Sequence, residues 1–142
     1  MQIVMILADH AQSTGGKLNL LGGGWNLTAA GPKNPPSGIG LVVTVAYNET
    51  NETQRIELHL VDEDGNPVVP RPDVTAPLVV PLEFEQGRPA GLLPGSNQNL
   101  CFAVNLGGIP TLEPDTGYRW EARTQGLRVA DVSFRTRPAT DA

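Results

Sequence analysis

Residues 112–122 read Leu112-Glu113-Pro114-Asp115-Thr116-Gly117-Tyr118-Arg119-Trp120-Glu121-Ala122, and this stretch decides the fold. Its first half is polar and contains a proline, which fixes the backbone and favours a bend. Its second half alternates large apolar residues with charged ones, which is typical of a strand with one buried face. We therefore predict a strand at about 118–125, entered through a fixed bend.

The same two-residue alternation recurs along most of the chain. It is clear in Leu41, Val43 and Val45, and again in Phe102 and Val104. No segment shows the 3.6-residue period of an amphipathic helix. The sequence predicts an all-β, immunoglobulin-like antiparallel sandwich in one domain over 1–137, with a short tail at 138–142. We expect eight or nine strands, at about 2–8, 17–22, 39–47, 54–62, 67–69, 78–85, 98–106, 118–125 and 127–135.

Glycine and proline mark the boundaries of these strands. Asp64-Gly65-Asn66 and Gln125-Gly126 each separate two patterned segments and predict hairpin turns. The segments Gly22–Gly38 and Gly87–Gly95 are too polar or too broken for strands and predict exposed loops. Loops of this kind often carry function.

The strand at 78–85 has the features of a sheet edge. Pro81 removes one backbone donor from the ladder, and Glu83 and Glu85 point away from the apolar face. Both features discourage pairing with a further strand. We therefore predict that this strand lies at an edge.

The last strand changes phase part-way along. Its apolar residues are Leu127 and Val129 in the first half, and Val132 and Phe134 in the second. If all four face inward, one extra residue must interrupt the period of two. The sequence predicts a β-bulge at Ala130-Asp131.

The stretch at the start of the final strands resembles the tyrosine corner of fibronectin type III and related immunoglobulin-like domains. The spacing L-x-P-x-T-x-Y is carried by Leu112, Pro114, Thr116 and Tyr118. The resemblance implies a buried Tyr118 ring whose hydroxyl bonds to backbone within residues 112–117. The chain is longer than such a domain, which has roughly 100 residues, so extra elements must account for the difference.

The N-terminal pattern resembles the opening of an uncharacterised family of small bacterial and phage-associated all-β proteins. It is carried by Leu7-Ala8-Asp9-His10 and by Gly16-Lys17 with Leu20-Leu21-Gly22-Gly23-Gly24-Trp25. The resemblance implies an all-β fold over most of the chain. It implies no activity and no functional residue.

Composition excludes several classes of protein. Ten basic and fifteen acidic residues give a net charge of −5, which opposes binding to nucleic acid or anionic membranes. The apolar stretch 3–8 is far shorter than the roughly 20 residues of a membrane-spanning helix. No basic residue precedes it, so we expect no secretory signal and a cytoplasmic protein, or a virion protein if phage-encoded. One cysteine excludes an internal disulfide and a cysteine-rich zinc site.

Candidate catalytic residues are few, and we expect no enzyme and no cofactor. Asp9, His10 and Ser13 supply the residue types of a nucleophilic triad, but residues so close on an extended chain do not converge. Glu83 and Glu85 evoke a paired-carboxylate hydrolase, although edge protection explains both. A hydrolase remains a second alternative.

Four other positions have ordinary explanations. His59 alternates with apolar residues and is interpreted as a solvated strand histidine, and Cys101 as an inert small residue. Asp62 and Asp64 lie in an acidic turn that could hold calcium, but the closing glutamate of a calcium loop is absent. Cation binding there stays open.

Four residues are candidates for interaction. Trp25 either folds back to cap an open end of the sandwich, which we favour, or stands exposed to stack on a sugar or a partner. Arg119, Arg123 and Arg135 share a polar face, which we interpret as a solvated face that needs no partner; the alternative is an interface that meets the acidic remainder of another copy.

These observations favour a non-enzymatic interaction or structural module. We expect its partners to be proteins, most concretely copies of itself in a repeated assembly, such as a phage-particle surface protein or a bacterial scaffold. The alternative is a module that binds carbohydrate or another small ligand through loop aromatics.

Overall fold

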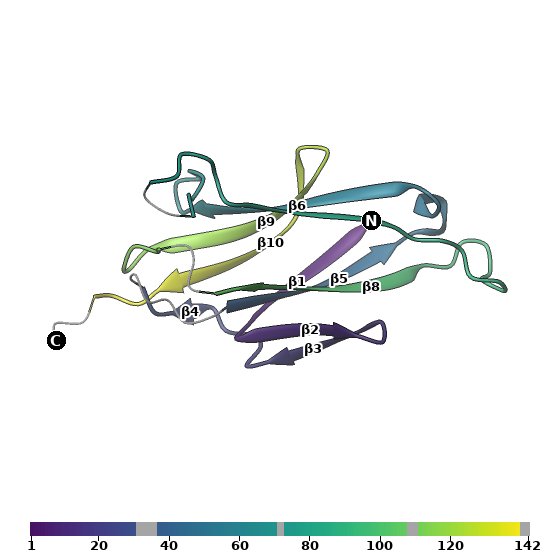
Figure 1. Ribbon diagram of the computed structural model, residues 1–142, viewed down its shortest axis with the longest axis horizontal. Helices are drawn as coiled ribbons and strands as arrows, with labels where there is room; N and C mark the ends of the chain where they lie inside the picture. Colours follow the sequence, from purple (N-terminus) through teal and green to yellow (C-terminus); the bar gives the residue numbers. More distant parts are fainter. Residues whose placement is uncertain (31–36, 71–72, 108–110, 140–142) are drawn as a thin grey trace.

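The computed structural model describes residues 1–30, 37–70, 73–107 and 111–139. Over these residues the chain forms ten strands and one 3-10 helix, so it is almost entirely β (Figure 1). The elements are β1 Gln2–Ala8, β2 His10–Thr14, β3 Lys17–Leu21, β4 Leu27–Thr28, β5 Ser37–Val45, η1 Tyr47–Glu49, β6 Thr53–Asp62, β7 Val79–Glu85, β8 Gln98–Leu106, β9 Gly117–Thr124 and β10 Leu127–Thr136. The all-β prediction is confirmed.

The strands form two main sheets that face each other (Figure 1). One has three antiparallel strands in the order β1-β5-β8, and the other has five in the order β4-β10-β9-β6-β7. All neighbours in the second sheet are antiparallel except β4, which runs parallel to β10. Consecutive elements therefore alternate between the sheets in several places, which ties the two layers together.

The core lies between the two sheets and follows the period of two. Ile39, Leu41, Val43 and Val45 of β5 are essentially inaccessible to solvent, as are Ile56, Leu58 and Leu60 of β6. The inward residues of β9 are Tyr118, Trp120 and Ala122, as the alternation predicts. Both central strands are thus buried on one face along their whole length.

The hairpin β2–β3 packs on the outer face of the three-stranded sheet as a third layer. The Asn105 amide of β8 holds it: the Ala11 N–H donates to Asn105 Oδ1 over 2.9 Å, and Asn105 Nδ2 donates to the Ala11 carbonyl over 2.8 Å. Leu18 and Leu20 lie over Gly40, where a Cβ atom would come within 2.8 Å of either side chain. This hairpin accounts for part of the extra length of the chain.

The corner before β9 has the predicted geometry. Tyr118 is buried, and its hydroxyl oxygen accepts a hydrogen bond from the Glu113 N–H over 2.8 Å. Leu112 is also buried, and the Thr116 hydroxyl donates to the Pro114 carbonyl over 2.8 Å. The predicted Tyr118 contact with backbone in residues 112–117 is confirmed.

The turns and the sheet edge also agree with the sequence. Gln125 and Gly126 both have positive φ angles, as a two-residue hairpin requires. β7, which contains Pro81, is the last strand of its sheet, and Glu83 and Glu85 are exposed.

Three details of the predicted strand map are wrong. Residues 67–69 make only an isolated bridge, Val61 to Pro67, and the short strands β2 and β4 were not expected. β4 lies inside the segment Gly22–Gly38 predicted as a loop, and residues 31–36 of that segment are outside the described residues. Of the predicted tail, residues 140–142 are also outside them.

The predicted bulge exists but lies one residue earlier. Arg128 pairs with Arg123 and Ala130 pairs with Ala122, so Val129 is the extra residue. Leu127 pairs with Thr124 and lies on the same face of the sheet as Ala122, but it is 71% exposed. Leu127 and Val129 lie where β10 extends past the core, so neither is buried against the opposite sheet.

Replacing Tyr118 by Phe should lower the free energy of unfolding by about 1–3 kcal/mol, because it leaves the half-buried Glu113 N–H without its acceptor while the ring stays in place. Urea denaturation measures the change. Tyr47→Phe is the matched control, since its ring keeps the stacking contact with Arg88. Equal stability of Tyr118→Phe and the wild type would contradict the role given to this hydroxyl.

Candidate functional site

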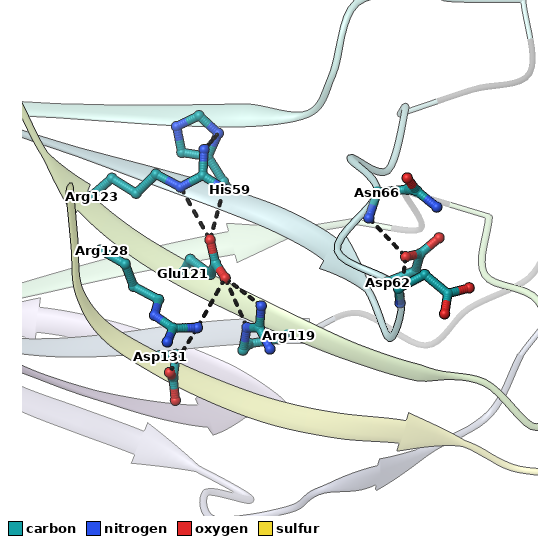
Figure 2. Close-up of polar contacts among 9 residues, drawn as sticks. His59, Asp62, Asn66, Arg119, Glu121, Arg123, Arg128 and Asp131 are labelled. Carbon is teal, nitrogen blue, oxygen red and sulfur yellow. Dashed lines mark hydrogen bonds and ion pairs between the residues drawn. The ribbon is translucent and has the colours of Figure 1, made fainter. Parts of the chain in front are cut away.

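The outer face of the five-stranded sheet carries a cluster of charged side chains centred on Glu121 (Figure 2). Arg119, Glu121 and Arg123 alternate along β9, so all three project from the same face. Arg128 of β10 joins them from the neighbouring strand. We call these four residues the Glu121 cluster.

Glu121 binds three arginines at once. Its Oε2 lies 2.6 Å from Arg119 NH2 and 3.4 Å from Arg128 NH1, and its Oε1 lies 2.7 Å from Arg123 NH2. The Glu121 side chain is only 8% exposed, because the arginines cover it. Desolvation by burial acts to raise the pKa of Glu121, but hydrogen bonds from Arg123 and Arg119 outweigh it and hold the pKa below the ordinary glutamate value.

His59 is part of the same face and is not the solvated histidine that the alternation predicted. It lies opposite Glu121 on β6, with its side chain 20% exposed. Its Nδ1 is 3.4 Å from Arg123 NH1, and its Nε2 is 3.5 Å from Glu57 Oε1. The ring is therefore mostly covered and lies between Arg123 and Glu57.

Arg135 lies apart from the Glu121 cluster. It donates to Asp115 Oδ1 over 3.1 Å and lies 3.4 Å from Glu63. An open cavity of about 390 Å³ at this end of the sheet is lined by Asp62 and Glu63 as well as by Arg119 and Arg135. Its wall is thus mixed in charge rather than basic.

Trp25 folds back onto the core. Its ring meets Phe134 edge to face, with centroids 5.7 Å apart and an interplanar angle of 80°. The ring contact is the one expected if Trp25 folds back, as the favoured prediction has it. The indole ring is committed to this internal contact.

The candidate catalytic residues are not brought together. The Ser13 hydroxyl donates to the Cys101 carbonyl over 2.8 Å, so its proton is directed to backbone and not to His10. Asp9 and His10 are both exposed. Glu83 lies at the sheet edge beside Arg55, 3.6 Å away, as edge protection predicts.

The acidic turn uses Asp62 as an internal cap. Asp62 Oδ1 accepts hydrogen bonds from the backbone N–H groups of Asp64 and Asn66, both over 2.9 Å (Figure 2 shows the second partner). Asp62 Oδ1 therefore bonds to backbone N–H groups of its own turn, whereas cation binding would require this oxygen to face outward.

The two lateral sides of the facing sheets differ. On one side, β1 lies beside β10, and its inward residues Ile3, Met5 and Leu7 are buried. On the other side, β7 and β8 are the edge strands, and every inward apolar residue along them is only half-buried. We call this row the open side; its members are Leu78, Val80, Leu82, Phe84, Leu100, Phe102, Val104 and Leu106.

Contact across the open side is made by aromatic rings. The Phe84 and Phe102 rings touch, with centroids 5.2 Å apart. At one end Gln86 Nε2 donates to Gln98 Oε1 over 2.8 Å. These two edges are therefore joined by side chains, with no backbone ladder between the described strands β7 and β8. The apolar residues of the open side remain partly exposed for this reason.

A family model matches residues 3–137, nearly the whole chain; it is described as a family of unknown function, DUF6941. The chain belongs to this family. The comparisons found no match among curated proteins and none among solved structures. No helix in the described part of this DUF6941 member is long and apolar enough to cross a membrane.

Sequence reasoning missed two features of these surfaces. The i, i+2 spacing of Arg119, Glu121 and Arg123 indicated a shared polar face with Arg128 beside them, but it was not foreseen that Glu121 binds three arginines. The open side was missed because alternation shows which residues face inward and does not show which strands are edges. The spacing signal alone could have identified Glu121 as the centre of the cluster.

Replacing Glu121 by Gln should destabilise the protein at neutral pH, because three guanidinium groups then surround a neutral amide. We expect about 1–3 kcal/mol, below the roughly 3–5 kcal/mol of a fully buried pair, since the arginines reach solvent. Urea denaturation measures it. Glu83→Gln is the control: that carboxylate is exposed, and its loss should cost well under about 1 kcal/mol.

We also expect the stability difference between the wild type and Glu121→Gln to depend on pH. A carboxylate whose pKa is lowered in the folded state stabilises the fold above its unfolded pKa of about 4.3 and loses that contribution as pH falls through the folded value. The stability difference between wild type and Glu121→Gln should therefore be full at neutral pH and shrink at about pH 3. A difference that stays constant across this range would contradict an ionised Glu121 as the source.

Proposed function

We propose that this protein is a non-enzymatic structural module that associates with copies of itself in a larger assembly. The observation that carries the proposal is the open side, a row of eight half-buried apolar residues along β8, β7 and the residue before β7. Contiguous exposed apolar surface favours contact with a protein partner, whereas scattered apolar residues do not.

The charged face is less suited to this contact. Arg119 and Arg123 already bind Glu121, and Arg135 binds Asp115 and Glu63. A guanidinium committed to an internal carboxylate gains little from a second one on a partner. Contact through the open side instead buries apolar area, which is favourable at any ionic strength.

The distribution of chemical groups supports a non-enzymatic role. A catalytic serine needs a base within hydrogen-bond reach, and Ser13 donates to a backbone carbonyl instead. His59 lies between Arg123 and Glu57 on a charged sheet face. Trp25, which carried the sugar-binding alternative, packs on Phe134.

The fold relationship forms part of the proposal. We propose an immunoglobulin-like sandwich with the hairpin β2–β3 added, because the tyrosine corner, with Leu112, Pro114, Thr116 and Tyr118, precedes β9 with its hydroxyl bonded to backbone. Many cell-surface domains share this sandwich architecture. A phage-particle surface protein or a bacterial scaffold fits the module described.

Light scattering on the purified protein tests the function. We expect a particle mass that is a multiple of the 15.1 kDa chain and that changes little with ionic strength. The double variant Val104→Ser, Leu106→Ser should weaken association by at least about tenfold, because it removes apolar area from the open side. A purified protein that stays monomeric at every concentration reached would overturn the proposal.

A second double variant is the matched control. Arg128→Ser with Arg135→Ser removes two half-exposed charges from the polar face and leaves the two closest partners of Glu121 in place. We expect its particle mass to equal that of the wild type. Dissociation of this control, with the open-side variant unaffected, would place the contact on the charged face and overturn the assignment to the open side.

A further inference from the structure

The four edge strands of the two sheets differ in how they are protected against pairing. β7 carries Pro81, Glu83 and Glu85, and β4 has only two residues. β1 lies beside β10. β8 is nine residues long and contains no charged residue and no proline. Among the edges in the described residues, β8 is therefore the one open to a further strand.

The sequence of β8 is complementary to itself in the antiparallel direction. Taken about Phe102 as the centre, small residues face each other, as do apolar residues and amides. The opposed pairs are Cys101 with Ala103, Leu100 with Val104 and Asn99 with Asn105. Only the terminal pair, Gln98 with Leu106, is mixed.

We infer that two copies of this chain pair β8 against β8, antiparallel, about a two-fold axis that passes beside Phe102. The inference rests on the proposed function and specifies which strands form the contact between copies. Two three-stranded sheets then become one six-stranded sheet, with the order β1-β5-β8 in each half. A two-fold contact of this type is isologous, so one self-complementary strand suffices.

Both faces of the joined sheet agree with this register. The half-buried residues Leu100, Phe102 and Val104 meet their counterparts on the inner face, so the cores of the two copies become continuous across the open side. On the outer face Asn99 lies opposite Asn105 of the second copy, and small residues meet beside them. The Asn99 Oδ1 accepts from the Thr44 hydroxyl and the Asn105 amide is bonded to Ala11, so the two asparagines match in polarity without a hydrogen bond between them. Ser13 donates to the Cys101 carbonyl, and a carbonyl oxygen has a second lone pair for a ladder bond.

Neighbouring registers fit less well. An odd shift in the pairing would place inner-face residues opposite outer-face residues, which the period of two forbids. An axis beside Cys101 puts Asn99 opposite Ala103, and Gln98 opposite Val104. An axis beside Ala103 puts Asn105 opposite Cys101. The axis beside Phe102 is the one that matches the two asparagines.

A single cysteine substitution tests the register. In Ala103→Cys, the new thiol lies opposite Cys101 of the second copy, at a Cα separation of about 4.5–5.5 Å. Disulfides form at roughly 4.4–6.8 Å, so two bonds should link the dimer covalently. Within one chain, residues 101 and 103 project in parallel with Cβ atoms about 6–7 Å apart, too far for the roughly 3.5–4.5 Å of a disulfide.

The matched control is Asn99→Cys on the same outer face of β8. Its thiol lies about 13 Å along the strand from Cys101 of the second copy, and should not link to it. With oxidised glutathione as oxidant, non-reducing electrophoresis should show at least about tenfold more linked dimer for Ala103→Cys than for Asn99→Cys or wild type. Equal linking in the two variants would overturn the register.

Amide hydrogen exchange on the wild-type protein tests the β8 pairing without any substitution. Protection of β8 amides should rise with protein concentration, while that of β7 amides stays constant. If light scattering shows multimers but β8 gains no protection, the β8 pairing is wrong and the proposed function stands. If the protein is monomeric throughout, both are wrong.

Discussion

Partly buried backbone groups before β9 impose the constraint on which the arrangement of the last two strands depends. Residues 113–116 turn beneath the sheet end, and their polar groups require partners there. Thr136, fully buried at the end of β10, supplies them: its hydroxyl donates to the Glu113 carbonyl over 2.6 Å and accepts from the Thr116 N–H over 3.0 Å. Together with the Tyr118 hydroxyl, this threonine fixes the corner to the last strand, and β9 and β10 stay in register.

Local chemistry made much of this fold predictable. The strands with strict alternation were found with ends correct to within two residues, and the corner spacing predicted the Tyr118 contact. Thr136 gave no signal, because its role depends on a segment twenty residues earlier in the chain. β2 was missed for the same reason, since His10–Thr14 lacks an alternating apolar face and is held by the distant Asn105 amide.

The candidate surfaces were less predictable, because they depend on strand order. The arginines on β9 and β10 suggested a basic face, but the register places Glu121 among them and Asp115 and Glu63 beside Arg135. Charges brought from separate elements therefore neutralise one another locally. Composition and spacing describe one strand at a time, whereas the balance of charge over a sheet depends on the order and register of several strands.

The contrast between the two lateral sides follows from the same chain order. The first and last long strands meet on one side, where β1 lies beside β10, and closure there draws the two sheets together. β7 and β8, joined by residues 86–97, remain as the opposite edges, and only side chains bridge them. One of these edges carries a proline and two exposed carboxylates, and the other carries none. Since both edges border the same half-exposed apolar row, protection of β7 alone directs a pairing strand to β8. The difference in protection between β7 and β8, which in one copy leaves an edge of the sandwich unpaired, then restricts pairing between two copies to β8.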